Sequence, residues 1–208
     1  MGITTWLDRI TDETNVWFSA VKAEERGEFC LAAALYLDDA TSCLKVESPL
    51  RAALSAYCAA DCLVRGGGGE EAKRLFLEAG VLYSEAAEDR LSDSIRESVW
   101  ALQRAYASFV QADDVKEAER VKWELEVLGR RANPFVGAPD GFGLPTPRPR
   151  SNPLGEEWST SGRDRELKAS LDRFSLLRRK MSEARPEKSP VRRVEEPFGQ
   201  EGLVSQLG

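Results

Sequence analysis

The prolines of this 208-residue chain are strongly segregated, and this limits how it can fold. Nine of the ten lie after Asn133, and only Pro49 lies before it. Proline lacks a backbone N–H and clashes with the preceding turn of a helix, so a packed helical body tolerates few of them. The segregation predicts a folded domain over residues 1–132 and a Pro- and Arg-rich tail over residues 133–208.

Apolar residues in the first part recur at steps of three and four, which places them on one stripe of a helix. Strict alternation is absent, so we expect no sheet. The stripes in the second half of this part are Ala72, Leu75, Phe76, Ala79, Leu82, Tyr83 and Ala86 in 70–89, Ile95, Val99, Leu102, Tyr106 and Phe109 in 94–112, and Val115, Ala118, Val121, Leu125 and Leu128 in 114–131. The earlier stripes are Trp6, Leu7, Ile10, Trp17 and Val21, then Phe29, Leu31, Leu35 and Leu44 in 28–46, then Leu50, Ala53, Leu54, Tyr57 and Val64 in 50–64.

Capping and turn residues separate these stripes. Serine or aspartate precedes several of them, with proline or glutamate at the spacing that helix N-termini favour. The expected caps are Ser48 with Pro49, Ser94 with Glu97, and Asp114 with Glu117, and the expected turns are Gly27, Gly66–Gly69 and Asp113-Asp114. Short connections force neighbouring helices to pack antiparallel, so we expect an all-α fold of about six helices in three hairpins.

One pattern occurs twice in this part of the chain. Gly27, Ala32 and Tyr36 lie at offsets of zero, five and nine residues, and the same offsets recur 40 residues later. The second copy is Gly67, Ala72 and Phe76, with Ala79 at offset twelve. Glycine turns the chain, alanine lets helices approach, and the aromatic ring fills the space between hairpins. The pattern resembles the second helix of tetratricopeptide repeats.

The repeat distance differs from the 34 residues of that family. Phrases such as AAALY, EEAKRLFLEAGVLY and DDVKEAERV are more similar to the soluble NSF attachment protein branch of the superfamily. The third hairpin keeps Ala118 but has Lys122 where the aromatic residue would lie. The resemblance covers roughly residues 12–131. It implies a right-handed stack of hairpins, an α-α superhelix, that binds proteins, and it carries over no catalytic residue.

The chain contains no histidine. This removes the most common general base and the most common metal ligand, and it excludes Ser-His and Cys-His nucleophile systems. Carboxylate or lysine chemistry remains conceivable, yet the pairs Asp38-Asp39 and Asp113-Asp114 are better explained by solvent or neighbour contacts and by capping. We therefore predict a protein that is not an enzyme, with no catalytic residue and no cofactor.

The four cysteines, Cys30, Cys43, Cys58 and Cys62, all fall on expected helices. They could form a four-thiolate zinc site, but no C-x2-C pair is present. Small buried thiols in a reducing compartment are the favoured interpretation, with no metal. The run Gly66–Gly69 lacks the lysine of a phosphate-binding loop and precedes two glutamates, so we interpret it as a turn between helices.

Four tryptophans, Trp6, Trp17, Trp100 and Trp123, lie in the predicted domain, and core packing is their expected role. The adjacent pairs Trp17-Phe18 and Val99-Trp100 point to different helix faces. One member of each pair is therefore a candidate for exposure and for contact with a partner.

The tail is rich in proline, glycine and arginine over residues 133–163, which predicts extended, disordered chain. Residues 163–184 differ, because apolar side chains recur there at helical spacing. These are Leu167, Leu171, Phe174, Leu177 and Met181. They predict an amphipathic helix whose stripe needs a partner groove, in the same chain or in another molecule.

Charge divides at the same boundary as proline. Residues 1–132 carry a balance of −8 and residues 133–208 a balance of +2, which makes nucleic acid an unlikely partner for the acidic domain. The segment 163–193 is locally basic, with 11 cationic and 5 anionic residues. Such a helix can bind an acidic protein groove, an anionic membrane or nucleic acid, and its mixed charges favour protein. The acidic domain is itself a candidate receptor.

Three short proline motifs in the tail are further candidate anchors for partner proteins. They are Asn133-Pro134-Phe135, Asn152-Pro153-Leu154 and Glu196-Pro197-Phe198-Gly199. The first is equally suited to ending the last helix of the domain.

These features favour a cytoplasmic, non-enzymatic adaptor or scaffold, in which the helical stack binds one protein and the tail helix another. One alternative is a membrane-associated trafficking or assembly factor that touches anionic lipid through Trp6, Leu7 and Ile10 or through the basic helix. Another, implied only by the family resemblance, is an adaptor that delivers a substrate to an ATPase. No small-molecule substrate is indicated.

Overall fold

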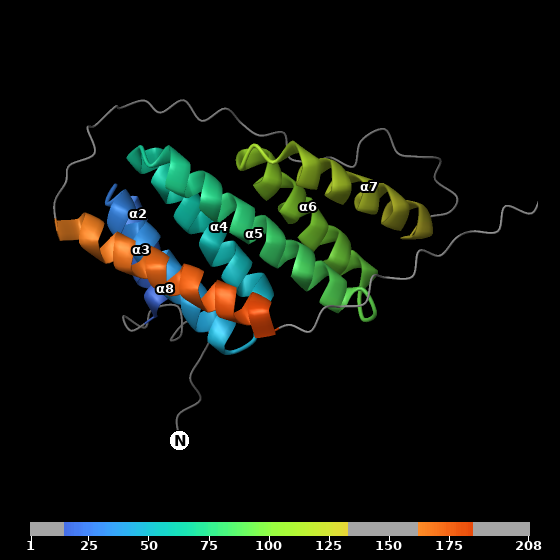
Figure 1. Ribbon diagram of the computed structural model, residues 1–208, viewed down its shortest axis with the longest axis horizontal. Helices are drawn as coiled ribbons and strands as arrows, with labels where there is room; N and C mark the ends of the chain where they lie inside the picture. Colours follow the sequence, from blue (N-terminus) through green and yellow to red (C-terminus); the bar gives the residue numbers. More distant parts are fainter. Residues whose placement is uncertain (1–14, 133–161, 185–208) are drawn as a thin grey trace, which may run out of the picture.

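The computed structural model describes residues 15–132 and 162–184, and every regular element in these ranges is an α-helix (Figure 1). The helices are α2 (Val16–Glu25), α3 (Phe29–Lys45), α4 (Pro49–Gly66), α5 (Gly69–Arg90), α6 (Ile95–Gln111), α7 (Val115–Ala132) and α8 (Gly162–Ala184). The predicted all-α class is thus confirmed for the described part of the chain. The predicted disorder of the tail and its three proline motifs lie outside these ranges.

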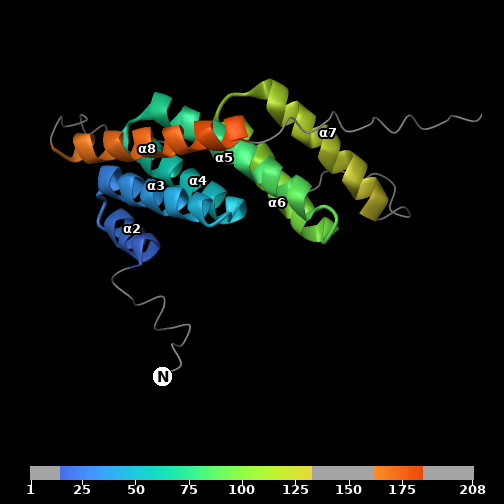
Figure 2. The same cartoon turned by 60° about the horizontal axis from the view of Figure 1, so that its bottom comes forward.

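Helices that are consecutive in sequence pack against each other from α2 through to α7. The tail helix α8 interrupts this order, because it packs against α3, more than a hundred residues earlier in the chain (Figures 1 and 2). It crosses the outside of the first helices and runs in the same direction as α3 (Figure 1). The described helices therefore form one packed body around a shared core.

Four of the turns between helices have the same geometry. Each contains one residue with a left-handed backbone, and the next amide donates to the carbonyl five residues before it, at 2.8–3.0 Å. The left-handed residues are Gly27 (φ 75°), Glu47 (φ 55°), Gly67 (φ 91°) and Asp113 (φ 60°). This is the Schellman arrangement, which satisfies the last carbonyls of a helix. The turns expected at Gly27, Gly66–Gly69 and Asp113-Asp114 are confirmed.

Two of the three predicted N-caps form the expected hydrogen bond. The amide of Glu97 donates to Ser94 Oγ at 3.3 Å, and that of Glu117 donates to Asp114 Oδ1 at 3.1 Å. Ser48 occupies the cap position before Pro49 but makes no side-chain capping bond. The helix predicted from Trp6 to Val21 is wrong as a single element. Asn15 is extended and accepts from the amide of Trp17, so α2 begins only at Val16.

The core is built largely from alanine and medium-sized apolar residues. All seven positions of the stripe predicted for 70–89 are buried. Leu54, Ile95 and Val115 are exposed, so the stripe prediction is wrong there. Ile95 and Val115 are the first residues of their helices. Helix α4 packs with α3 on one side and α5 on the other through alanines, which leaves Leu54 at its outer edge.

Aromatic pairs join α2 to α3 and α4 to α5. The rings of Trp17 and Tyr36 lie 5.0 Å apart at 68°, and those of Tyr57 and Phe76 lie 5.2 Å apart at 66°. Both are edge-to-face contacts of the kind that adds about 0.5–1.5 kcal/mol beyond area burial. The second pair lies 40 residues after the first at both partners. The two helix pairs therefore use the same contact at the same place.

The left-handed turns make a prediction about stability. Gly27 has open space where a Cβ would lie, so Gly27→Ala tests the backbone conformation alone. We expect it to lower the free energy of unfolding by about 1 kcal/mol, and Glu47→Gly to raise it by a similar amount. Urea unfolding of both variants measures these changes. Equal stability of Gly27→Ala and the parent chain would contradict the assigned geometry.

The contact between α5 and α6 makes a second prediction. A Cβ on Gly80 would lie 2.7 Å from Cε1 of Phe109, whose ring is fully buried. We expect Gly80→Ala to destabilise the fold by about 1–3 kcal/mol through overpacking. Thermal and urea unfolding of Gly80→Ala, Phe109→Leu and the double variant form the test. Strict additivity of the two changes would show that the side chains do not meet.

Candidate helix-binding site

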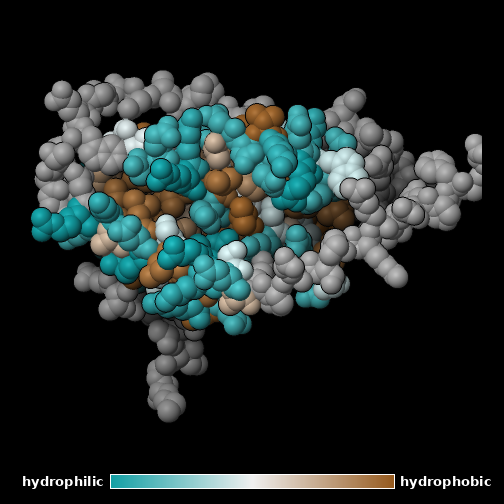
Figure 3. Space-filling view, viewed as in Figure 1, coloured by the Kyte–Doolittle hydropathy of each residue, from teal (hydrophilic) through white to brown (hydrophobic). Residues whose placement is uncertain are grey.

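Helix α8 lies on a face formed by α3 and α5, and its apolar stripe points to the core. Phe174 has no exposed surface and Leu167 has 4%, and both belong to the same core cluster as α2–α7. Leu171, Leu177 and Met181 are partly buried against that cluster. The stripe predicted for 163–184 is thus placed in contact with the same chain. Figure 3 shows hydrophobic side chains beside the hydrophilic outer surface of α8.

A buried arginine joins α8 to α5. The side chain of Arg178 is only 8% exposed, and its Nε donates to Glu78 Oε2 at 3.1 Å. Its two terminal nitrogens face Glu85, with Nη2 3.4 Å from Oε1 and Nη1 3.5 Å from Oε2. Glu78 and Glu85 are seven residues apart and therefore lie on one face of α5. Arg178 thus places its charge between two carboxylates at the edge of the core.

A second, more exposed arginine joins α8 to α3. Nη2 of Arg173 donates to Asp38 Oδ1 at 2.7 Å and to Ser170 Oγ at 2.9 Å. Ser170 is 2% exposed and lies between the two apolar anchors of the helix. The site therefore combines an apolar floor with three carboxylates, those of Asp38, Glu78 and Glu85. This arrangement suits a cationic amphipathic helix.

The adjacent carboxylates Asp38 and Asp39 lie on different sides of α3. Asp39 is buried and faces α4, where its Oδ2 accepts from Ser55 Oγ at 2.6 Å and its Oδ1 faces Arg51 at 3.4 Å. Cys43 Sγ lies 3.7 Å from Asp39 Oδ2. Asp38 binds the tail helix. The two carboxylates therefore do not form a paired acid–base site, and the contact of Asp38 with α8 was not among the sequence-based predictions.

None of the four cysteines forms a disulfide bond. Burial raises the pKa of the Cys43 thiol to about 11, with a further contribution from Asp39. Burial likewise raises the pKa of Cys62 to about 12. Such thiols are poor nucleophiles at neutral pH. Across residues 15–132 and 162–184, no group of three or more cysteines and carboxylates is arranged to hold a metal ion.

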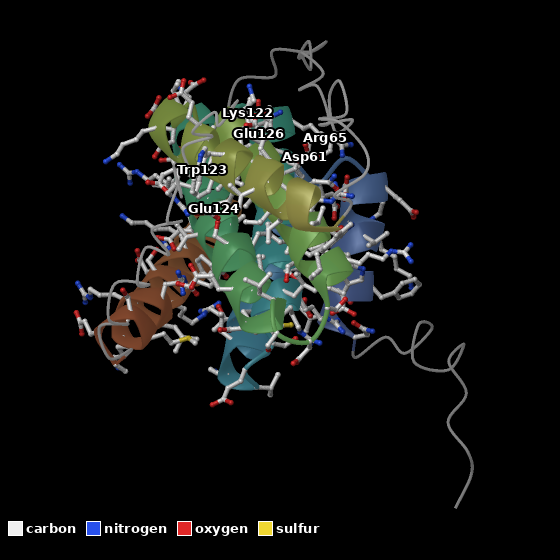
Figure 4. All side chains as sticks on the ribbon, turned by 90° about the vertical axis from the view of Figure 1, so that its right-hand side faces the viewer. Asp61, Arg65, Lys122, Trp123, Glu124 and Glu126 are labelled. Carbon is white, nitrogen blue, oxygen red and sulfur yellow. The ribbon has the colours of Figure 1, made fainter. Side chains whose placement is uncertain are left out.

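A polar cluster ties α2 to α3 and α4. The hydroxyl of Tyr36 donates to Glu24 Oε2 at 3.0 Å, and Arg65 forms an ion pair with the same carboxylate. Burial and the bond to Glu24 raise the pKa of Tyr36. The guanidinium of Arg65 also lies 4.3 Å from the ring centre of Phe29. Figure 4 shows Arg65 beside Asp61 on α4. This cluster connects helices within the body and reaches no part of α8.

The tryptophans differ in burial. Trp17 is partly buried against the core. Trp100 is 40% exposed and lies edge-on to Tyr83, with the guanidinium of Arg104 5.4 Å from its ring centre. Trp123 is 62% exposed among the charged side chains of α7 (Figure 4), so core packing was a wrong prediction for it. It follows Val121 by two residues, which rotates it about 200° away from the buried stripe.

Sequence reasoning missed Arg178. Its position continues the apolar stripe, because it follows Phe174 by four residues and Leu167 by eleven. A charged residue in such a stripe signals a buried ion pair, since an unpaired buried charge is costly. Glu78 and Glu85, at a seven-residue spacing beside the stripe of α5, are the complementary signal. The other predicted partner-binding residues, Asn133, Pro134 and Phe135, lie outside the described ranges.

No helix among the described residues is both long enough and apolar enough to cross a membrane. Comparison of the chain with protein-family models, with curated proteins and with solved structures finds no match. The function is therefore inferred from the geometry of the α3–α5 face and its bound helix.

The ion pairs of α8 predict unequal roles for neighbouring arginines. Arg178→Met removes the guanidinium that contacts Glu78 and Glu85, and we expect it to weaken the docking of α8 by about 1.5–3 kcal/mol. Arg179→Met serves as the control, because the Arg179 side chain is 69% exposed. Hydrogen exchange of the α8 amides measures docking. Equal loss of protection in both variants would show that Arg178 has no special role.

Proposed function

We propose that this chain is a non-enzymatic protein-interaction adaptor whose helical body is a receptor for an amphipathic helix. The observation that carries this proposal is the seating of α8 on α3 and α5 through buried apolar anchors and a two-carboxylate contact at Arg178. The absence of histidine in the sequence and the high pKa of Cys43 and Cys62 also support a role in binding over one in catalysis.

The finer architecture is part of the same proposal. We infer that α2–α7 form three antiparallel hairpins stacked with a right-handed twist, as in tetratricopeptide-like proteins. The support is local: Gly27 and Gly67 have the same left-handed turn, and the aromatic pairs of the first two hairpins recur after 40 residues. Stacked hairpins leave long helix faces at the surface, and such faces are the usual binding surfaces of repeat proteins.

The docking of α8 limits which surfaces of the proposed adaptor are free to bind a partner. With α8 seated, its stripe is turned to α3 and is not free to engage a second protein or a lipid surface. The tail helix can act as a separate binding element only after it leaves the body. The adaptor therefore has a closed form, in which receptor face and tail helix cover each other, and an open form with both exposed.

A cleavage experiment tests whether the body holds α8 without the covalent link. A specific protease site is inserted within residues 136–158 of the full chain, and the cut protein is passed over a gel-filtration column. We expect the fragment with α8 to elute with the body and to be released progressively as salt is raised, because ion pairs contribute to its binding.

Two substitutions sharpen this test. Phe174→Ala removes a fully buried ring, and we expect the α8 fragment to dissociate, since such a change costs about 3–5 kcal/mol in a packed site. Leu176→Ala is the matched control, because Leu176 is 45% exposed on the outer side of α8. Separation of the parent fragments at low salt would contradict the proposed receptor role.

A further inference from the structure

We propose that the α3–α5 face is the binding site for a cationic amphipathic helix of a partner protein, and that α8 is its exchangeable occupant. This inference rests on the proposed receptor function and names the partner by its chemistry. The partner helix would carry an arginine four residues after a large apolar anchor. It would compete with α8 for the same contacts.

The way α8 fits the face suggests that it can be replaced. Among the described side chains of α8, four are buried, and they are Leu167, Ser170, Phe174 and Arg178. Two of these are apolar, while Leu171, Leu177 and Met181 are only partly covered and Leu176 faces outward. A helix with so few complete anchors is a modest ligand. Its position in the same chain offsets this by keeping its effective concentration high.

The position of Ser170 is one at which a partner helix could bind the face more tightly than α8 does. It fills a buried position between Leu167 and Phe174 with a small polar side chain, and its hydroxyl accepts from Arg173 of its own helix. Among the described residues, this hydroxyl forms no hydrogen bond with α3 or α5. A helix with an apolar residue at this position would bury more apolar surface on the same floor and would bind more tightly.

The carboxylates of the face determine which helices fit. Glu78 and Glu85 both contact one planar guanidinium, which carries several N–H donors. A lysine has only a single ammonium group with which to contact the two carboxylates. Asp38 provides a third negative charge at the α3 edge. Removal of the arginine takes away the guanidinium that both carboxylates contact, so the face discriminates against helices that lack it.

The same charges argue for a protein partner over an anionic membrane or a nucleic acid. When α8 leaves, Asp38, Glu78 and Glu85 remain on the face, and they repel phosphate groups. A cationic helix of another protein restores both the apolar cover and the charge balance. Release also frees the stripe of α8, so exchange at the face changes what the tail can bind.

The test uses the full chain and a fluorescent peptide of residues 162–184 as the competing helix, measured by anisotropy. The chain is compared with Arg178→Glu, which places a like charge beside Glu78 and Glu85 and opens the site without creating a core cavity. We expect the peptide to bind the opened chain at least tenfold more tightly than the parent chain, because its own α8 no longer competes. Circular dichroism melting confirms that α2–α7 stay folded, and Leu167→Ala provides a second opened variant.

Peptide variants test the recognition itself. On the opened chain, we expect the Arg178→Met peptide to lose at least tenfold in affinity, the Arg179→Met peptide to bind as the parent peptide does, and the Ser170→Ala peptide to bind more tightly. We also expect a chain that carries Glu78→Arg and Glu85→Arg to prefer an Arg178→Glu peptide. Equal binding of the parent peptide to closed and opened chains would overturn the proposal, as would indifference to Glu78 and Glu85.

A vesicle experiment tests whether an anionic lipid surface, in place of a protein helix, draws α8 off the body. The parent chain carries a fluorophore on α8. It is titrated with anionic phospholipid vesicles in one experiment and with the peptide in another. Release by peptide with none by vesicles supports the proposal, and release by vesicles alone overturns it.

If the cut chain retains α8 but no peptide exchanges, the partner inference fails while the receptor function stands. If the cut chain loses α8, the receptor function fails.

Discussion

The close packing of α3, α4 and α5 positions the face that holds the tail helix. Alanines cover the contact faces of α4, so α3 and α5 both pack closely against it. Bulky side chains there would push the helices apart, since packed cores have little spare volume. This packing places Asp38 of α3 and the glutamates of α5 within reach of one tail helix. The helix-binding face is therefore a consequence of the alanine-rich core.

The binding of α8 combines two effects that act differently. Burial of Leu167 and Phe174 provides most of the favourable free energy, at about 1.5–3 kcal/mol for each fully buried side chain. The ion pair of Arg178 contributes less net stabilisation, because desolvation of the charges opposes their attraction. Its larger effect is on selectivity, since a helix without the arginine leaves Glu78 and Glu85 beside a covered surface. Apolar burial holds α8, and the selectivity that we propose for the face rests on charge.

Much of the fold could be predicted from the sequence because its signals are local. The stripe expected in 70–89 corresponds to α5, and the capping residues Ser94 and Asp114 mark the starts of α6 and α7. The left-handed residue Glu47 could not be predicted in this way, since glutamate has no preference for that conformation.

The candidate site was harder to predict, because it depends on contacts across about a hundred residues. The apolar stripe of residues 163–184 requires a groove to cover it, but the spacing of apolar residues does not identify the surface that provides this groove. In the sequence, Arg178 is one of 11 cationic residues in the basic segment 163–193, although it lies in line with Phe174. Trp123 shows the opposite error, since a large aromatic residue does not indicate burial when it lies opposite the stripe. Periodicity identifies faces, and tertiary contacts decide their partners.

If the full chain holds α8 on α3 and α5 in solution, the ring protons of Phe174 lie close to aliphatic protons of the body. We expect nuclear Overhauser contacts between them in the intact protein, together with slow exchange of the Nε proton of Arg178. Random-coil chemical shifts for residues 162–184, with no contact from Phe174 to the rest of the chain, would contradict it.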